Sequence, residues 1–228
     1  MPHFVFDLNE DDSIKAIYKD GVKLETGTRL EMPVATVQTY FRAAIRALAR
    51  MTESDDDRES NRGHGLQAFL MSLVGTEAFL NVFFHQVGRE KGLAKVIDLA
   101  NKDRVPIEHK LSHLPRQAFG TQLPAQKRLN AKMRELYDLR SKIVHPRWQP
   151  SSLQMPGLAI ADLVENYQQL FEDREFCREA LRWCLLVVAR IGLHAGAGRG
   201  DQFVHFWTTI ADTNATLSAA LGVPPEGA

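Results

Sequence analysis

The alternation of hydrophobic and polar residues changes character near residue 33. In residues 3–32 polar and apolar side chains alternate, as in "HFVFDL" and "SIKAIYKD", and Asp20-Gly21 is a dipeptide suited to a tight hairpin turn. From Pro33 onward, apolar residues recur every three or four positions, which is typical of helices. The pattern predicts a small β element over residues 1–33, a helical bundle over 34–222 and a short tail at 223–228.

The first predicted helix starts near Pro33, because proline is well tolerated in the first turn of a helix. Its apolar face is formed by Val37, Phe41, Ile45 and Leu48. The following stretch is acidic and contains no large apolar residue after Met51, which predicts a mobile linker at about residues 52–63.

Six further helices are expected beyond this linker. Their approximate ranges are 66–88, 92–103, 125–144, 158–171, 173–194 and 201–221. Residues 104–124 contain three prolines and one glycine, so we expect a long irregular connection there with about one helical turn. The expected fold class is mainly α, a helical bundle with a small N-terminal β-hairpin element.

Charge and cysteine content narrow the possible environments and partners. Lys plus Arg and Asp plus Glu both total 28, so the whole molecule has no net field that would attract nucleic acid or anionic lipid. Cys177 and Cys184 are seven residues apart in one predicted helix, too far for a disulfide, which favours a reducing cytoplasm. The N-terminus lacks the pattern of a signal peptide, and no membrane association is expected.

One arginine occupies an apolar position of the predicted helix at 125–144. Leu129, Met133, Leu136 and Ile143 form its apolar stripe, and Arg140 takes the missing place between the last two. Arg140 should therefore point toward the bundle. A guanidinium there must be paired or face a wet cleft, because a lone desolvated charge is strongly unfavourable.

A histidine follows this arginine at the expected end of the helix. Pro146 disfavours helical geometry at His145, so the helix should end at about Val144 or His145. The helix dipole favours the protonated imidazole there, and histidine is a natural proton carrier near neutral pH. Arg140 and His145 together are suited to RNA cleavage without a metal, with the arginine stabilising phosphate charge and the histidine acting as general acid or base.

The charge around this pair is locally positive. Residues 127–147 contain seven basic side chains and two acidic ones, a local charge of +5 that would attract a phosphate backbone. A second histidine pattern, His109 and His113 at i and i+4, has the spacing of a metal-binding pair. It lacks an evident third ligand, so solvated surface histidines are the favoured interpretation and no metal site is expected.

"LYDLRSKIVH" resembles the Arg-x4–6-His signature of the HEPN superfamily, helical-bundle proteins many of which are endoribonucleases of toxin–antitoxin, abortive-infection and antiviral defence systems. The bare spacing occurs four times in the chain, but only Arg140–His145 lies at an apolar-flanked helix end. The resemblance implies Arg140 and His145 as the catalytic pair, Ser141 as a candidate orienting group, and a homodimer with two motifs in one cleft. Lys142, Arg147 and Glu77 are further candidates for binding or support, and no cofactor is implied.

The residues are compatible with two hypotheses. The first is a metal-independent endoribonuclease, a dimer held in check by an antitoxin or regulatory protein, in which Arg140 and His145 share a solvent-accessible basic cleft. The second is a non-catalytic bundle of the same fold that binds a nucleotide, an RNA or a protein. It predicts that Glu77, the one acid on the apolar stripe of the helix at 66–88, neutralises Arg140 and that Arg140 is shut away from solvent.

Overall fold

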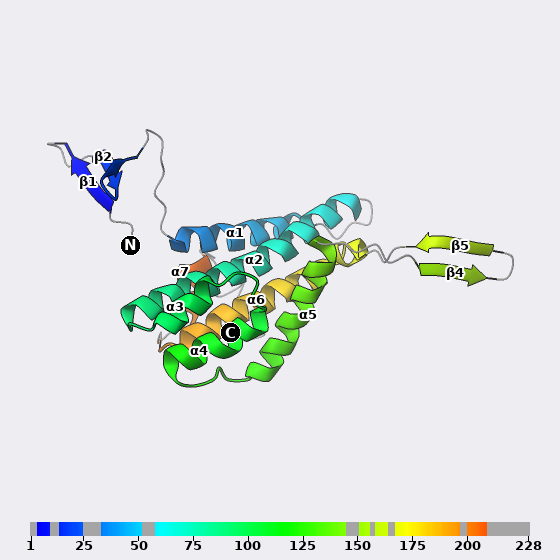
Figure 1. Ribbon diagram of the computed structural model, residues 1–228. Coiled ribbons are helices and arrows are strands. Elements are labelled where there is room, and N and C mark those ends of the chain that lie inside the picture. The colour runs from blue at the N-terminus through cyan, green and yellow to red at the C-terminus, as the bar shows by residue number, and fades with distance from the viewer. Residues whose placement is uncertain are drawn as a thin grey trace, which may run out of the picture. The chain divides into compact units, whose positions relative to one another are not determined.

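A computed structural model of the protein describes residues 4–9, 14–24, 33–51, 58–144, 151–155, 158–163, 167–196 and 200–208 (Figure 1). The chain divides into two compact units, Met1–Met32 and Pro33–Ala228. The described part of the first unit is a β-sheet, and that of the second is mainly helical.

The N-terminal unit is a small antiparallel sheet whose strands follow chain order: β1 (Phe4–Leu8), β2 (Ile14–Lys19) and β3 (Val22–Lys23). Lys19 pairs with Val22, so only Asp20 and Gly21 connect β2 and β3. Both turn residues have positive φ, 52° and 81°, as a tight hairpin turn requires. The predicted β element and its turn are confirmed.

The second unit is mainly helical, as the sequence predicted. Its described helices are α1 (Pro33–Arg50), α2 (Arg58–Glu90), α3 (Ala94–Asn101), α4 (Ile107–Phe119), α5 (Gln126–Val144), α6 (Arg174–His194) and α7 (Gly200–Thr208), with a 3₁₀ helix at Gln168–Phe171. A hairpin of β4 (Ser151–Met155) and β5 (Leu158–Leu163) lies between α5 and the 3₁₀ helix in the chain.

Helix α2 is the centre of this unit. It packs against α1, α3 and α6, and Figure 1 shows it alongside α1 and α6. Its Phe69, Phe79 and Phe84 are fully buried, as is Phe41 on α1. Within the described residues, α2 alone is long and apolar enough to cross a membrane, but half of that apolar stretch is buried inside the bundle. This is the pattern of a core helix.

The start of α2 corrects the predicted linker. The helix begins at Arg58, so residues 58–63 are helical, while residues 52–57 lie outside the described part of the chain. Arg62 Nε donates to Glu172 Oε1 at 2.9 Å, and Asn61 is buried. Gly65 lies so close to the carbonyl of Phe171 that no Cβ would fit. The first turns of α2 have a polar sequence because they pack through the Arg62–Glu172 ion pair and the close approach of Gly65 to Phe171, and not through large apolar side chains.

A second correction concerns residues 104–124, where an irregular connection with about one helical turn was predicted and the structure has the helix α4 over Ile107–Phe119. Pro115 lies inside α4 and has no N–H, so the carbonyl of Leu111 loses its usual helical donor. Gln126 Nε2 replaces that donor at 2.7 Å. Helix α4 therefore tolerates proline because Gln126 of α5 donates to the carbonyl that Pro115 leaves without a helical donor.

The third correction concerns the predicted helix at 158–171, where the structure has strand β5 and a 3₁₀ helix. Met155 pairs with Leu158, which leaves two residues between β4 and β5. The sequence places Pro156-Gly157 there, a dipeptide typical of turns. The predicted helices at 66–88, 92–103, 125–144 and 173–194 are confirmed, whereas residues 209–221 of the last predicted helix and the tail lie outside the described residues.

We predict that Gln126→Ala lowers the free energy of unfolding by about 1–3 kcal/mol, because the buried Leu111 carbonyl loses the donor that replaces the missing Pro115 N–H. Urea unfolding followed by circular dichroism measures the change. Gln117→Ala, at an exposed position of α4, is the matched control and should change stability by less than about 0.5 kcal/mol. Equal stability of the two variants would contradict this role for Gln126.

Candidate functional site

Helix α5 carries the candidate site and is held to the bundle by its buried stripe. Leu129, Met133 and Leu136 are buried, as the sequence predicted. One turn before Arg140, Tyr137 donates its hydroxyl hydrogen bond to the carbonyl of Leu73 on α2 at 2.7 Å. The position of Arg140 in the bundle is therefore fixed through its neighbour on α5.

The Arg140 side chain is half-buried at the end of the apolar stripe, as expected. Its Cζ atom lies 5.8 Å from the centroid of the Tyr137 ring, a cation–π contact. Within the described ranges, no hydrogen bond or ion pair is formed by this guanidinium. Arg140 thus packs on an aromatic ring, and no residue that the structure describes uses its donors.

Glu77 lies on α2, half-buried, and it does not form an ion pair with Arg140 among the described residues. Its charge instead influences the pKa of two groups on neighbouring helices, Tyr137 on α5 and Lys110 on α4. Burial raises the pKa of Tyr137 well above its usual value, and the carboxylate of Glu77 adds to this rise while Arg140 opposes it. The negative charge of Glu77 and the positive charge of Arg140 therefore act on the same phenol without a direct contact between them.

Lys110 on α4 is a second charged group inside the bundle that is influenced by Glu77. Lys110 is only 2% exposed, and its Nζ donates to Asn81 Oδ1 at 2.7 Å and to the Ala100 carbonyl at 3.1 Å. Burial lowers the pKa of Lys110, while the negative charge of Glu77 and then of Asp103 opposes that change. Lys110 and Glu77 therefore interact electrostatically, although the hydrogen bonds of the Lys110 ammonium are to Asn81 and the Ala100 carbonyl.

Sequence reasoning missed Lys110. In "PIEHKLSHL" it takes the place of an apolar residue between Ile107 and Leu114, a helical spacing that is visible only if the segment is interpreted as a helix. Because the three prolines and one glycine of residues 104–124 predicted an irregular connection, no buried position was predicted for Lys110.

The remaining predicted site residues come after Arg140 in the chain. Ser141 and Lys142 are exposed on the last turn of α5, and Lys142 Nζ lies 3.2 Å from the hydroxyl of Tyr167 and 5.0 Å from its ring centroid. Helix α5 ends at Val144, at the predicted place. His145 and Arg147 lie outside the described residues. Of the predicted catalytic pair, the structure therefore describes Arg140 and not His145.

The basic character of α5 is partly neutralised. Lys132 pairs with Glu135 at 2.8 Å, and Arg134 pairs with Glu108 of α4 at 3.2 Å. Lys127 is exposed near the start of the helix and forms no ion pair with any residue that the structure describes. The positive surface available to an anion is therefore smaller than the local charge of +5 suggests.

The two histidines of α4 stack on each other, with ring centroids 4.1 Å apart. His109 is exposed and His113 is half-buried. Over the described part of the chain, no group of three or more histidine, cysteine, aspartate or glutamate side chains could hold a metal ion.

Comparison with known proteins assigns no family to this chain. No protein-family model matches the sequence, and no curated protein or solved structure is significantly similar to it. The function is therefore inferred from the residues of α5 and the helices packed against it.

Both cysteines are free thiols buried in α6, and burial raises the pKa of each to about 12. We predict that neither reacts with an aromatic disulfide reagent at pH 7.5 in the folded protein, because the reactive thiolate is almost absent. Reaction should be at least roughly 10³-fold slower than for an exposed cysteine of ordinary pKa, and two thiols should appear on unfolding. Rapid reaction of either thiol in the folded protein would contradict the buried position of that cysteine.

Tyr137→Phe removes the hydrogen bond to Leu73, and we predict a loss of about 1 kcal/mol in the free energy of unfolding at pH 8. The raised pKa of Tyr137 also makes its contribution to the free energy of unfolding depend on pH. The folded protein keeps the Tyr137 proton to higher pH than the unfolded chain, so this contribution is complete below about pH 10 and is lost as pH rises through the raised value.

Urea unfolding between pH 8 and 11 should therefore show a shallower alkaline decline in Tyr137→Phe than in the wild type. Tyr40→Phe on α1 is the control and should keep the wild-type slope. Identical slopes in all three proteins would show that Tyr137 ionises equally in the folded and unfolded states.

Proposed function

We propose that the protein is a metal-independent endoribonuclease of the HEPN type, with Arg140 and His145 as its catalytic pair. The observation that carries this proposal is the state of Arg140. Its guanidinium is half-buried, lies against the Tyr137 ring and has no ion-pair or hydrogen-bond partner among the described residues. The competing hypothesis of a non-catalytic bundle requires Arg140 to be neutralised by Glu77 and closed off from solvent, and the geometry favours neither condition.

Arg140 suits the role of phosphate ligand. A guanidinium never loses its charge at physiological pH and presents a fork of donors that matches two phosphate oxygens. The contact with Tyr137 is made by the guanidinium carbon, 5.8 Å from the ring centroid, and it positions the group without using its N–H donors. In the proposed reaction, Arg140 stabilises the negative charge that develops on the phosphorane as the RNA phosphodiester is attacked.

His145 is assigned the proton transfers. In the sequence it directly follows Val144, the last residue of α5, and the C-terminal end of a helix favours a cation. In the proposed reaction it exchanges a proton with the attacking 2′-hydroxyl or the leaving 5′-oxygen. The two residues are five positions apart in sequence, and the proposal brings their side chains together at one phosphate.

The surroundings of the pair are assigned to RNA binding. Ser141 and Lys142 are exposed beside Arg140, and with Arg147 they would contact phosphates next to the cleaved bond. An RNA substrate and two free thiols are both consistent with a protein that acts in the cytoplasm. In this proposal two copies of the chain bring two motifs into one cleft, and an antitoxin or regulatory protein restrains the activity.

We predict that Arg140→Ala and His145→Ala each reduce cleavage of a mixed RNA pool, with a chelator present throughout, by at least about 10²-fold. The reason is that each variant removes one of the two groups that act on the transition state. Gel analysis of end-labelled RNA gives the rates, and circular dichroism confirms that each variant is folded.

Arg134→Ala is the matched control, because it removes the same charge from the exposed face of α5 and breaks only a surface ion pair with Glu108. It should retain cleavage within about threefold at saturating RNA. Equal background cleavage in all four proteins would contradict the nuclease proposal and favour the non-catalytic binding bundle.

A further inference from the structure

A pocket of about 220 Å³ lies between the start of α5 and the middle of α6. Arg128, on α5, is twelve residues before Arg140, or about 18 Å along the helix axis. The pocket is therefore separate from the proposed catalytic pair. Its lining side chains that carry charge or polar groups are Arg128, Glu179, Arg182, Trp183 and Arg190.

The lining is strongly cationic in a chain of zero net charge. Three guanidiniums and one carboxylate face the same pocket, which leaves two positive charges in excess. Arginine side chains cannot relieve their repulsion by losing a proton. Such a cluster is most favourable when an anion occupies the space between the guanidiniums.

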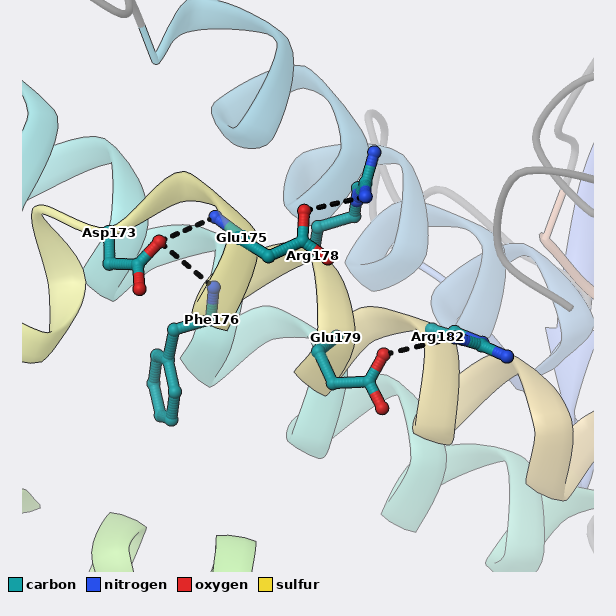
Figure 2. Close-up of polar contacts among 6 residues, drawn as sticks. All are labelled: Asp173, Glu175, Phe176, Arg178, Glu179 and Arg182. Atoms are coloured by element: carbon teal, nitrogen blue, oxygen red, sulfur yellow. Dashed lines mark hydrogen bonds and ion pairs between the residues drawn. The ribbon is translucent and has the colours of Figure 1, made fainter. Parts of the chain in front are cut away.

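The single carboxylate is already engaged. Glu179 Oε1 accepts the indole N–H of Trp183 at 2.7 Å, and Glu179 Oε2 accepts from Arg182 Nη1 at 3.3 Å. Figure 2 shows the Glu179–Arg182 contact on α6. Glu179 thus holds Trp183 in place and balances Arg182, so it leaves the other two guanidiniums without a counter-ion of their own.

Those two guanidiniums come from two different helices, Arg128 from α5 and Arg190 from α6. Arg128 lies over the Trp183 ring, with its Cζ atom 5.5 Å from the ring centroid, and Arg190 lies two turns further along α6 than Trp183. In the described part of the chain, neither takes part in an ion pair. Because Arg128 already covers the Trp183 ring, the pocket offers charge and not a face for stacking a base.

The backbone adds to the positive field. Pro124 and Ala125 line the same pocket and lead directly into Gln126, the first residue of α5. The N-terminal end of a helix carries a partial positive charge. The helix end and the guanidiniums therefore attract the same kind of ligand.

We propose that this pocket binds a phosphate-bearing anion, with Arg128 and Arg190 as its principal ligands. A volume of about 220 Å³ is smaller than a typical site for a drug-sized molecule and fits a diphosphate or a sugar phosphate. The phosphate belongs either to a free small ester or to one unit of an RNA strand. The proposal does not depend on RNA cleavage, because it rests on residues that the catalytic pair does not include.

Inorganic pyrophosphate, titrated into the full-length protein at low salt and followed by calorimetry, is the probe. We expect saturable binding by the wild type. Arg190→Gln should weaken it by at least about tenfold, because a charged donor is lost. Glu179→Gln should tighten it by about threefold, because a like charge is removed while the amide oxygen still accepts from Trp183.

Arg178→Gln is the matched control. Arg178 lies on the same helix, outside the pocket lining, and pairs with Glu175 at 2.6 Å, as Figure 2 also shows. It should bind pyrophosphate like the wild type. Absence of saturable binding, or equal affinity in the wild type and all variants, would overturn the proposal.

Two further measurements complete the test. The first identifies the source of the phosphate, and the second tests whether the pocket is independent of the proposed catalytic pair. Displacement of pyrophosphate by a short RNA oligonucleotide would assign the pocket to an RNA strand, whereas displacement by ribose 5-phosphate and not by RNA would assign it to a free ester. Arg140→Ala should keep the wild-type affinity for pyrophosphate. Loss of affinity in that variant would contradict the separation of the pocket from the catalytic pair.

Discussion

The burial of α2 is the constraint on which the rest of the bundle depends. A helix of 33 residues with apolar groups on most sides must be surrounded, and α1, α3 and α6 surround it. Gly65 and Gly75 let neighbours approach closely, since a side chain at Gly65 would meet the Phe171 carbonyl and one at Gly75 the ring of Phe41. Helix α5 then joins α2 through the Tyr137–Leu73 hydrogen bond, and this contact determines where Arg140 lies.

Arg140 lies on α5 near another charge of the bundle, and among the described residues the two do not pair. Glu77 is a half-buried charge on α2, and its carboxylate acts on the pKa of Tyr137 and of Lys110. The Lys110 ammonium is itself held by Asn81 and a backbone carbonyl. A permanent cation that is held by an aromatic ring and not used for internal pairing is suited to an anionic substrate. The same logic applies to Arg128, which also rests on an aromatic ring.

The sequence predicted those features that depend on local periodicity. It predicted the buried stripe of α5, the place where α5 ends and the place of Arg140 on that stripe, because a 3.6-residue period and a following proline act locally. It missed α4, because Pro115 is tolerated only through the hydrogen bond from Gln126 to Leu111, a contact between two helices. The arginine pocket was missed for the same reason, since its residues come from segments about fifty positions apart.

The chemistry assigned to Arg140 and His145 fixes which ends the products carry. Proton transfer at the 2′-hydroxyl makes that oxygen the nucleophile and leaves a 5′-hydroxyl on the downstream fragment. The most direct measurement is therefore the analysis of product ends from a defined RNA cut with a chelator present, beside the same RNA carrying a 2′-deoxy nucleotide at the cleavage site. The account predicts 5′-hydroxyl ends and no cleavage at the deoxy position. Products with 5′-phosphate ends, or cleavage of the deoxy substrate, would contradict it.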